Sequence, residues 1–321
     1  MIRYIIVRIL WLIPVIMIVS LIVFTLMELA PGNIADIILG QAEEMSDEDY
    51  LILIQRYNLD KPMIYRYGIY MLNLVQGDLG LSDQTHTSVW DEFILRLPNT
   101  LILSFAALII GTIIAIPLGI VAARRAGSVA DTAVSFVALI GMSMPQFWVG
   151  LLLILLFVDY LGWLPSGTFE YGFRSLILPA LCSSFILLAN ASRQTRSNVL
   201  EVLKADYLRT ARAKGVPERY VIRKHALGNA WIPIITSLGS SLCTQLAGAV
   251  VVEQVFAWPG IGRMAAEAVR ARDVTAVTGC VIMTTILYVV VQLVVDILYA
   301  FVDPKIKSQY VNTGRKRRRT A

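Results

Sequence analysis

Six long stretches without a charged residue or histidine constrain this chain more than any other feature. They are Ile9–Met27, Leu97–Ala123, Thr132–Val158, Ser175–Ser192, Ala226–Val252 and Val274–Val295. A helix needs about 20 apolar residues to cross a bilayer, and only helices or closed barrels satisfy every backbone polar group in lipid. Because these stretches lack the alternation of a barrel strand, they predict an all-α polytopic membrane protein with six transmembrane helices.

The composition and the first stretch agree with this prediction. The chain is 57% hydrophobic and 16% charged, whereas soluble domains average about 25% charged residues. The first stretch is longer than the apolar core of a signal peptide, which is about 7–15 residues. The sequence "MELAPG" that follows contains no small-x-small cleavage pattern. We therefore expect this stretch to stay as the first transmembrane helix.

The distribution of lysine and arginine predicts the orientation. Six spans place both termini on the same side as residues 124–131 and 193–225, and together these segments hold 20 of the 28 Lys and Arg residues. Cytoplasmic segments carry such an excess, so we expect both termini in the cytoplasm. The basic tail, residues 308–321, is then expected to contact lipid headgroups and not nucleic acid.

The spans divide the chain into four expected regions. These are a first helix within residues 1–30, an extracytoplasmic segment over 31–96, a core of five transmembrane helices over 97–307 and the tail at 308–321. In the extracytoplasmic segment, Ser46 and Asp49 form a fair start for a capping box. Further along, Tyr65, Tyr67 and Tyr70 suit the boundary between headgroups and water. The segment could cover helix ends or contact an external partner.

The segment from Arg193 to His225 combines nine Lys and Arg residues with only three acids. Its apolar residues recur at helical spacing, and Gly215 followed by Pro217 is a typical stop signal. The pattern predicts a helix at about 199–216 with one apolar stripe. The stripe needs a partner, either the chain's own neighbouring helices or another protein. Its members are Leu200, Leu203, Tyr207 and Ala211.

Within the fifth stretch, small and hydroxyl-bearing residues share one helical face. Such residues let membrane helices pack closely, and the same face could instead line a path for a solute. Both interpretations stay open. The residues are Ser237, Ser241, Thr244, Gly248 and the neighbouring Gln245. Separately, proline within a span predicts a local kink, and Pro117, Pro145 and Pro233 occupy such positions.

After the fifth stretch, Pro259, Gly260 and Gly262 predict a tight turn, and "RMAAEAVRARD" reads as a short helix behind it. Glu253 stands just before this turn. It could meet an amine of a substrate or form a structural pair with a nearby arginine, and we favour the structural pair. The turn itself could be a simple connector or an external gate.

The sequence contains no pattern for a catalytic, metal or cofactor site. Cys182, Cys243 and Cys280 fall inside expected spans and form no CxxC, while His86 and His225 lie on opposite sides of the membrane. No Gly-Lys dipeptide occurs, so the chain has no phosphate-binding P-loop. We expect neither an enzyme nor a bound cofactor.

The basic loop carries a resemblance to a known family. Arg209-Thr210-Ala211, followed three residues later by Gly215, resembles the EAA motif of bacterial ATP-binding-cassette (ABC) importer permeases, with Arg209 in place of the name-giving Glu. The longer stretch "DYLRTARAKGVPERYVIRKHALGNAWIPIIT" is similar to the branch that imports dipeptides, oligopeptides or nickel, where Arg is the usual form. The resemblance covers about residues 1–307, through "LAPGN", "LDKP", "GDLGLS", "GMSMPQFWVGLLL", "EQVFAWPGIG" and "VDPKI".

This resemblance implies that the basic loop between the fourth and fifth spans is a coupling helix that docks on an ATPase subunit. The apolar stripe would then fill a groove on that subunit while the loop's cations meet acidic residues at the rim. The coupling residues would be Asp206, Tyr207, Arg209, Thr210, Ala211, Arg212, Lys214 and Gly215. The polar face from Ser237 to Gly248 would line the pathway, and Glu253 with the following turn would form the external gate.

The resemblance also implies partners and a location. We expect a multi-pass protein of the bacterial plasma membrane that pairs with a second, similar permease chain. ATP and Mg would be used by two cytosolic ATPase subunits, and an extracytoplasmic solute-binding protein would deliver the cargo. The cargo would be a di- or oligopeptide, with nickel or a metal chelate as the alternative. A proton- or sodium-coupled secondary transporter is less expected, because ionisable relays within the membrane are absent from the middles of these spans.

Overall fold

The computed structural model describes residues 2–29, 51–52, 55, 58, 60–167 and 171–302. Helices make up nearly all of this part, and only an isolated bridge between Leu81 and Ser88 has β character within it. The helix expected from Ser46 and the basic tail at 308–321 lie outside the described residues. The chain separates into two compact units, of which the first contains residues 96–263 and the second contains 9–95 and 264–286.

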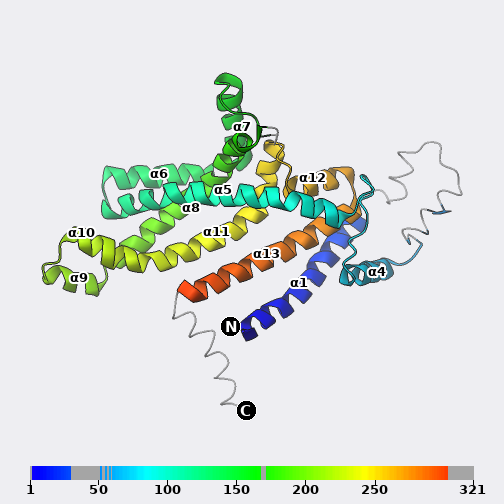
Figure 1. Cartoon of the computed structure of the whole chain (residues 1–321), viewed down its shortest axis with the longest axis horizontal. Helices are drawn as coiled ribbons and strands as arrows, with labels where there is room; N and C mark the ends of the chain where they lie inside the picture. Colours follow the sequence, from blue (N-terminus) through cyan, green and yellow to red (C-terminus); the bar gives the residue numbers. More distant parts are fainter. Residues whose placement is uncertain are drawn as a thin grey trace, which may run out of the picture. The chain divides into compact units, whose positions relative to one another are not determined.

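The first unit is a bundle organised around one long central helix. Its elements are α5 (Val89–Arg124, from Arg96 onward), α6 (Val129–Ser143), α7 (Gln146–Ile154), the π-helix η1 (Leu155–Tyr160), α8 (Phe173–Leu203), α9 (Asp206–Ala213), α10 (Glu218–Tyr220), the π-helix η3 (Val221–Ala226) and α11 (Leu227–Val255). The central helix α8 packs against α6, α7 and α11 (Figure 1). The short helices α9 and α10 lie together at one end of this bundle (Figure 1).

Small residues bring α5 close to α8. A Cβ atom added to Gly119 would lie 2.6 Å from the carbonyl oxygen of Ser192, and one added to Gly111 would lie 2.3 Å from the side chain of Leu187. Larger side chains at these glycines would force the helices apart, so close approach depends on them. Around Trp258 and Phe256, both fully buried, an apolar core forms with residues of α5, α7 and α8.

The second unit is built from most of α1 (Ile2–Glu28), α4 (Met63–Val75), most of α12 (Ile261–Ala271) and the first part of α13 (Val274–Val302). A buried polar contact of this unit lies at the start of α13. There the buried carboxylate of Asp273 accepts hydrogen bonds from the Ser82 hydroxyl at 2.5 Å and from the backbone N–H of Ala276 at 2.8 Å. This contact fixes the loop before α5 to the first turn of α13.

Each of the six apolar stretches coincides with helix in the structure. Four helices of the described part are long and apolar enough to cross a membrane, and the number rises to six if each of two bent pairs counts as one span. The four are α1, α5, α8 and α13, and the pairs are α6 with the 146–160 segment and the two parts of α11. The fold is therefore all-α with four to six spans.

The bends only partly follow the prolines. The chain turns by 99° between Ser143 and Gln146, so the kink expected at Pro145 is confirmed. In contrast, α5 and α11 continue as helices through Pro117 and Pro233. The 51° bend in α11 lies farther along, between Leu246 and Ala249. Proline removes one hydrogen bond without requiring a break, so the local kinks expected at Pro117 and Pro233 stay predictions.

Candidate functional site

The basic loop forms two helices where the sequence predicted one over 199–216. Helix α8 ends at Leu203, and α9 begins at Asp206 after a turn at Lys204. Ala205 has an extended backbone, with ψ of 141°, which interrupts the helical hydrogen bonds. The predicted stop is confirmed, since α9 ends at Ala213 and Gly215 adopts a φ of +75° that favours glycine.

The apolar side of α9 is covered by the chain itself. Leu208 is fully buried against Val221 and Ala226 of η3, and Ala211 packs on the same cluster. Leu203, at the end of α8, belongs to this contact as well. Of the two partners that the sequence left open, the chain's own helices therefore take the apolar side. Leu203 and Ala211 are partly buried by this packing, whereas Tyr207 of the same stripe is exposed, so contact of the stripe with another subunit stays a prediction.

The opposite side of α9 is polar, cationic and exposed. The Arg209 side chain is 79% exposed, with the Asp206 carboxylate 3.8 Å from its guanidinium. Lys214 is exposed at the end of the helix. Two hydrogen bonds, at 2.9 and 3.1 Å, join the Arg212 guanidinium to Glu218 and lower the pKa of this carboxyl. The residues of α9 and its C-terminal turn that are exposed are Asp206, Tyr207, Arg209, Thr210, Arg212, Ala213, Lys214 and Gly215.

A polar contact connects this surface to α11. The Asn229 side chain donates a hydrogen bond to the Tyr207 hydroxyl at 3.0 Å and another to the His225 carbonyl at 3.0 Å. Together with the packing of Leu208 on η3, this contact ties α9 to the N-terminal end of α11. A displacement of α9 would therefore be passed directly to α11.

An ion pair that was not predicted from sequence joins α6 to α8 at the same end of the bundle. The Arg196 guanidinium engages Asp131 with both a Nε and a Nη2 hydrogen bond, the latter at 2.7 Å. The Asp131 carboxylate also accepts from the backbone N–H of Gly127 at 2.9 Å. Ser128 caps α6, so Ser128-x-x-Asp131 is a capping-box signal. That signal could have located Asp131, but not its distant partner.

The hydroxyl-bearing face of α11 is internally satisfied. Ser237, Ser241 and Thr244 each donate to the carbonyl four residues earlier, at 2.8, 2.9 and 3.1 Å. Gln245 instead crosses to α8, donating to the Ser183 carbonyl at 2.9 Å. Gln245 therefore serves helix packing, while Thr244 and the neighbouring Ser240 are exposed. The surroundings of Gly248 lie outside the described part of the chain.

The turn after α11 is closed around a fully buried carboxylate. Glu253 accepts hydrogen bonds from the Thr100 hydroxyl at 2.6 Å and from the backbone N–H of Arg263 at 2.9 Å. The same hydroxyl accepts from the Ile261 N–H at 2.9 Å. A Cβ atom on Gly260 would lie 2.2 Å from the carboxylate, so glycine is required there. Glu253 is thus an internal brace for the first turn of α12.

Two contacts of Asn99 complete this brace. The Asn99 side-chain amide donates to the Pro259 carbonyl at 2.8 Å, and the Asn99 backbone carbonyl accepts from the indole N–H of Trp258 at 3.0 Å. The turn is consequently fixed to the start of the apolar part of α5. Glu253 has structural partners in the Thr100 hydroxyl, which was not foreseen, and in the backbone N–H of Arg263, while the pair with an arginine side chain that was favoured from sequence stays a prediction.

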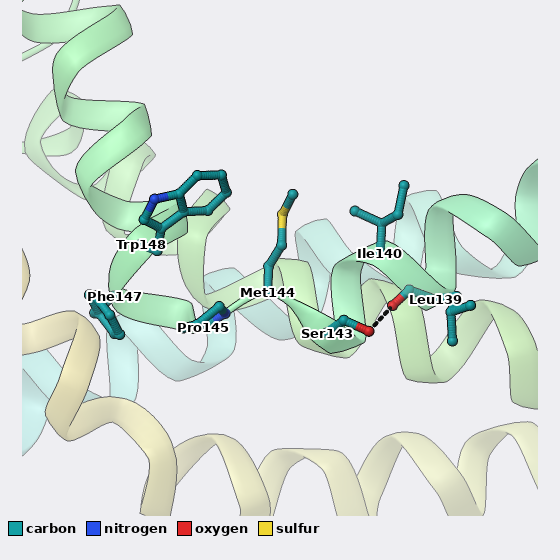
Figure 2. A pocket seen from close by; sticks show the side chains of 7 residues that line it. All are labelled: Leu139, Ile140, Ser143, Met144, Pro145, Phe147 and Trp148. Carbon is teal, nitrogen blue, oxygen red and sulfur yellow. Dashed lines mark hydrogen bonds between the residues drawn. The ribbon is translucent and has the colours of Figure 1, made fainter.

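An open hollow of about 610 Å³ lies at the 99° bend between α6 and α7. Figure 2 shows Ile140, Met144 and Trp148 projecting to the same side of this bend. Ser143, the polar side chain of the lining, donates to the Leu139 carbonyl at 2.9 Å. The hollow is therefore apolar and offers little to bind the polar backbone of a peptide. The remaining lining residues are Leu139, Pro145 and Phe147.

Comparison with known proteins places these features in a family. Residues 115–308 match the family described as "Binding-protein-dependent transport system inner membrane component". Residues 1–104 match the N-terminal region of the same type of membrane component. Together the two matches include the basic loop, the hydroxyl-bearing face and the braced turn.

Similar proteins extend over almost the whole chain. The oligopeptide transport system permease protein AppB of Bacillus subtilis is 38% identical over 96% of this chain and 100% of its own length. The di/tripeptide transport system permease protein DppB of Pseudomonas aeruginosa is 39% identical over 93% of this chain and 96% of its own. Among solved structures, the inward-facing MetNI methionine ABC transporter has a TM-score of 0.51 at 17% identity, covering 66% of this chain and 96% of that one.

Proposed function

Since this chain belongs to the family of binding-protein-dependent transport inner membrane components, we propose that it forms half of the translocation pathway of an ABC importer for di- or oligopeptides. The family is a transport component of the inner membrane and not itself an enzyme. Relatives that cover nearly the whole chain are named for oligopeptides and di- or tripeptides. Their names favour peptides over nickel or a metal chelate as the cargo.

The exposed cationic side of α9 is the observation that carries this function. Arg209 and Lys214 project from a helix whose apolar side is already used within the chain. A charged surface on a rigid support suits contact with acidic residues of another protein. This surface is proposed to bind an ATPase subunit through Tyr207, Arg209 and Lys214. Arg212 has an internal partner in Glu218, so it contributes less to this contact.

The topology follows from placing this surface in the cytoplasm. Counting each bent pair as one span gives six spans, and the positive-inside distribution puts both termini on the α9 side. The turn braced by Glu253 is then extracytoplasmic. In this arrangement α11 runs from the ATPase contact at one membrane surface to the braced turn at the other.

Movement of α9 is proposed to reach the pathway along α11. Closure of two ATPase subunits on ATP would displace α9, and the contacts of Leu208 with η3 and of Tyr207 with Asn229 would carry α11 with it. The exposed hydroxyl-bearing residues Ser240 and Thr244 are proposed to line the path on the moving helix. Their spare acceptor capacity suits a peptide N–H.

The braced turn is proposed to act as a rigid external gate. Its backbone is fixed by Glu253, Thr100 and Asn99, so it would move as one piece with the start of α5 and the end of α11. The remaining partners are a second permease chain of similar sequence, which completes the pathway, and an extracytoplasmic solute-binding protein. ATP and Mg would be bound by the ATPase subunits and not by this chain.

A charge reversal on α9 tests the proposal. The chain is purified with its second permease, ATPase subunits and solute-binding protein, and reconstituted into lipid nanodiscs. Changing Arg209→Glu is expected to weaken ATPase binding and to lower peptide-stimulated ATP hydrolysis by about tenfold, because it places like charges at the contact. Arg270→Glu, an exposed position on α12, is the matched control and should leave both quantities unchanged.

Two results would contradict the proposal. The first is equal ATPase binding and stimulation in Arg209→Glu and in the unmodified importer. The second is peptide uptake by the chain alone in vesicles that hold a proton gradient and no ATPase, which would favour a secondary transporter.

A further inference from the structure

Helix α4 packs against α1 at the level of a candidate membrane span. The Tyr67 hydroxyl donates to the Met17 carbonyl at 2.9 Å and shares a hydrogen bond of 3.0 Å with the Ser20 hydroxyl, which is fully buried. The ring of Phe24 lies 5.8 Å from that of Tyr67 and 6.1 Å from that of Tyr70. These contacts form one continuous seam between the two helices, which lie side by side in the second unit (Figure 1).

The position of this seam along α1 indicates its depth. The apolar span of α1 runs from Ile5 to Leu26, which at 1.5 Å per residue is about 33 Å and matches a hydrocarbon core of about 30 Å. Ser20 therefore lies about 9 Å below the Leu26 end of the span, and Met17 about 14 Å below it. A helix that bonds to both residues lies at or below the headgroup level and not in the water beyond it.

The flank of α4 next to this seam is apolar. Ile64, Leu72 and Val75 are 82%, 64% and 83% exposed within the described part of the chain. With Gly68 they recur at steps of four, four and three residues, which places them on one flank of the helix. Asn73 is exposed on a separate polar flank, about 100° round the helix from Leu72, and the C-cap residue Gln76 is exposed at the end of the helix. Three strongly exposed large side chains on one short helix form the kind of patch that marks a binding surface.

We propose that α4 is embedded in the leaflet that surrounds the C-terminal end of α1, with Ile64, Leu72 and Val75 in contact with lipid acyl chains. Lipid is the occupant because the seam lies inside the span and the exposed surface of α1 beside it is itself apolar, at Ile18, Leu21 and Ile22. The polar flank with Asn73 then faces the headgroups, as in other amphipathic helices that lie in the membrane interface. The inference depends on α1 being a span and not on the cargo or on the coupling surface.

Site-specific fluorescence quenching tests this placement. The natural cysteines Cys182, Cys243 and Cys280, all buried, are changed to alanine, and single cysteines are introduced by Leu72→Cys and Val75→Cys, with Asn73→Cys as the control on the polar flank. Each variant is labelled with an environment-sensitive probe in detergent, assembled with its partner subunits and reconstituted into phospholipid vesicles. Peptide-stimulated ATP hydrolysis confirms that each variant is folded.

We expect brominated acyl chains to quench the probes at Leu72 and Val75 about threefold more strongly than the probe at Asn73. Aqueous iodide should show the reverse order. Stronger iodide quenching at Leu72 than at Asn73 would place the flank in water and overturn the proposal. Protection of the Leu72 and Val75 probes from both quenchers would show that protein covers the flank, and would overturn it equally. Should one of the two variants not assemble, Ile64→Cys replaces it.

Discussion

The α9 surface exposes its charged side chains, whereas the turn after α11 buries the carboxylate at its centre. In α9 the buried side chain is apolar Leu208, and the charged Arg209 is 79% exposed. In the turn the buried side chain is Glu253, with no exposed surface, and the backbone of the turn folds around it. In the sequence, both regions carry charged residues close to a long apolar stretch. The difference teaches that burial, and not residue type, separates a charge that is free to meet a partner, as proposed for Arg209, from one that holds the chain together.

Removing the buried carboxylate should have the largest effect on stability. Glu253→Ala leaves the Thr100 hydroxyl and the Arg263 N–H without their acceptor, at about 1–3 kcal/mol each, so we expect a loss of about 3 kcal/mol. Unfolding can be followed in detergent with a thiol-reactive dye, because the natural cysteines are buried. Glu201→Ala, an exposed carboxylate on α8, should change the unfolding temperature little. Equal stability of Glu253→Ala and Glu201→Ala would mean that the buried carboxylate does not hold its turn together, and the difference between the two regions would disappear.

Truncating the buried side of α9 should have the next largest effect. Leu208→Ala opens a cavity against Val221 and Ala226, and we expect a loss of about 2 kcal/mol, at the low end for a buried leucine because the helix is short. Thr210→Ala, on the exposed side, is the matched change and should cost less than about 0.5 kcal/mol. Thermal unfolding measures both. If Thr210→Ala were the more damaging change, the assignment of the inner side of α9 would be reversed.

The ion pair between Asp131 and Arg196 offers a test at the α9 end of the bundle. Asp131→Asn removes the negative charge and one of the two acceptor oxygens that join α6 to α8. We expect a smaller loss of stability than for Leu208→Ala, together with fewer peptides transported per ATP hydrolysed. The charge swap Asp131→Arg with Arg196→Asp should recover part of this ratio. Recovery of unfolding temperature without recovery of the transport ratio would mean that the pair only stabilises the bundle.

The smallest effect is expected for the exposed pair of Arg212 and Glu218. The arginine lowers the pKa of Glu218 below its ordinary value of 4.5, so the pair stabilises the folded chain above that pH and loses its contribution as the pH falls through the lowered pKa. Glu218→Gln should therefore lower the unfolding temperature slightly at pH 7. At a pH well below 4.5 the variant and the natural chain should unfold together. A difference that grew on acidification would contradict this sign.

Local sequence patterns predicted the elements well. All six apolar stretches are helical, because length and continuous hydrophobicity leave a membrane segment few alternatives. Gly215 ends the basic loop helix as expected, since its positive φ is a local property. The kink at Pro145 was likewise predictable. Family resemblance, confirmed by the comparisons, came from short motifs placed in order along the chain.

Features that depend on distant contacts were not predictable. The partner of Asp131 lies 65 residues away on α8, and Thr100 stands 153 residues before the carboxylate that it contacts. Nothing in a single sequence specifies such pairs. The break at Lys204 was missed because Leu203 and Tyr207 kept a helical spacing across it. The predicted stripe contains the exposed Tyr207 and leaves out Leu208, which is the fully buried residue of α9.

The π-helix η3 between α10 and α11 determines how α11 is rotated about its own axis. Each wide turn of a π-helix takes up an extra residue compared with an α-helix, so η3 sets the rotational phase with which α11 starts. One residue corresponds to about 100° of rotation. A shortening of Val221–Ala226 by a single residue would swing Ser240 and Thr244 about a quarter of the way round the helix, while the ends of α11 stayed at nearly the same height. The length of this six-residue segment therefore determines which side chains of α11 face a given direction, although none of those side chains is changed.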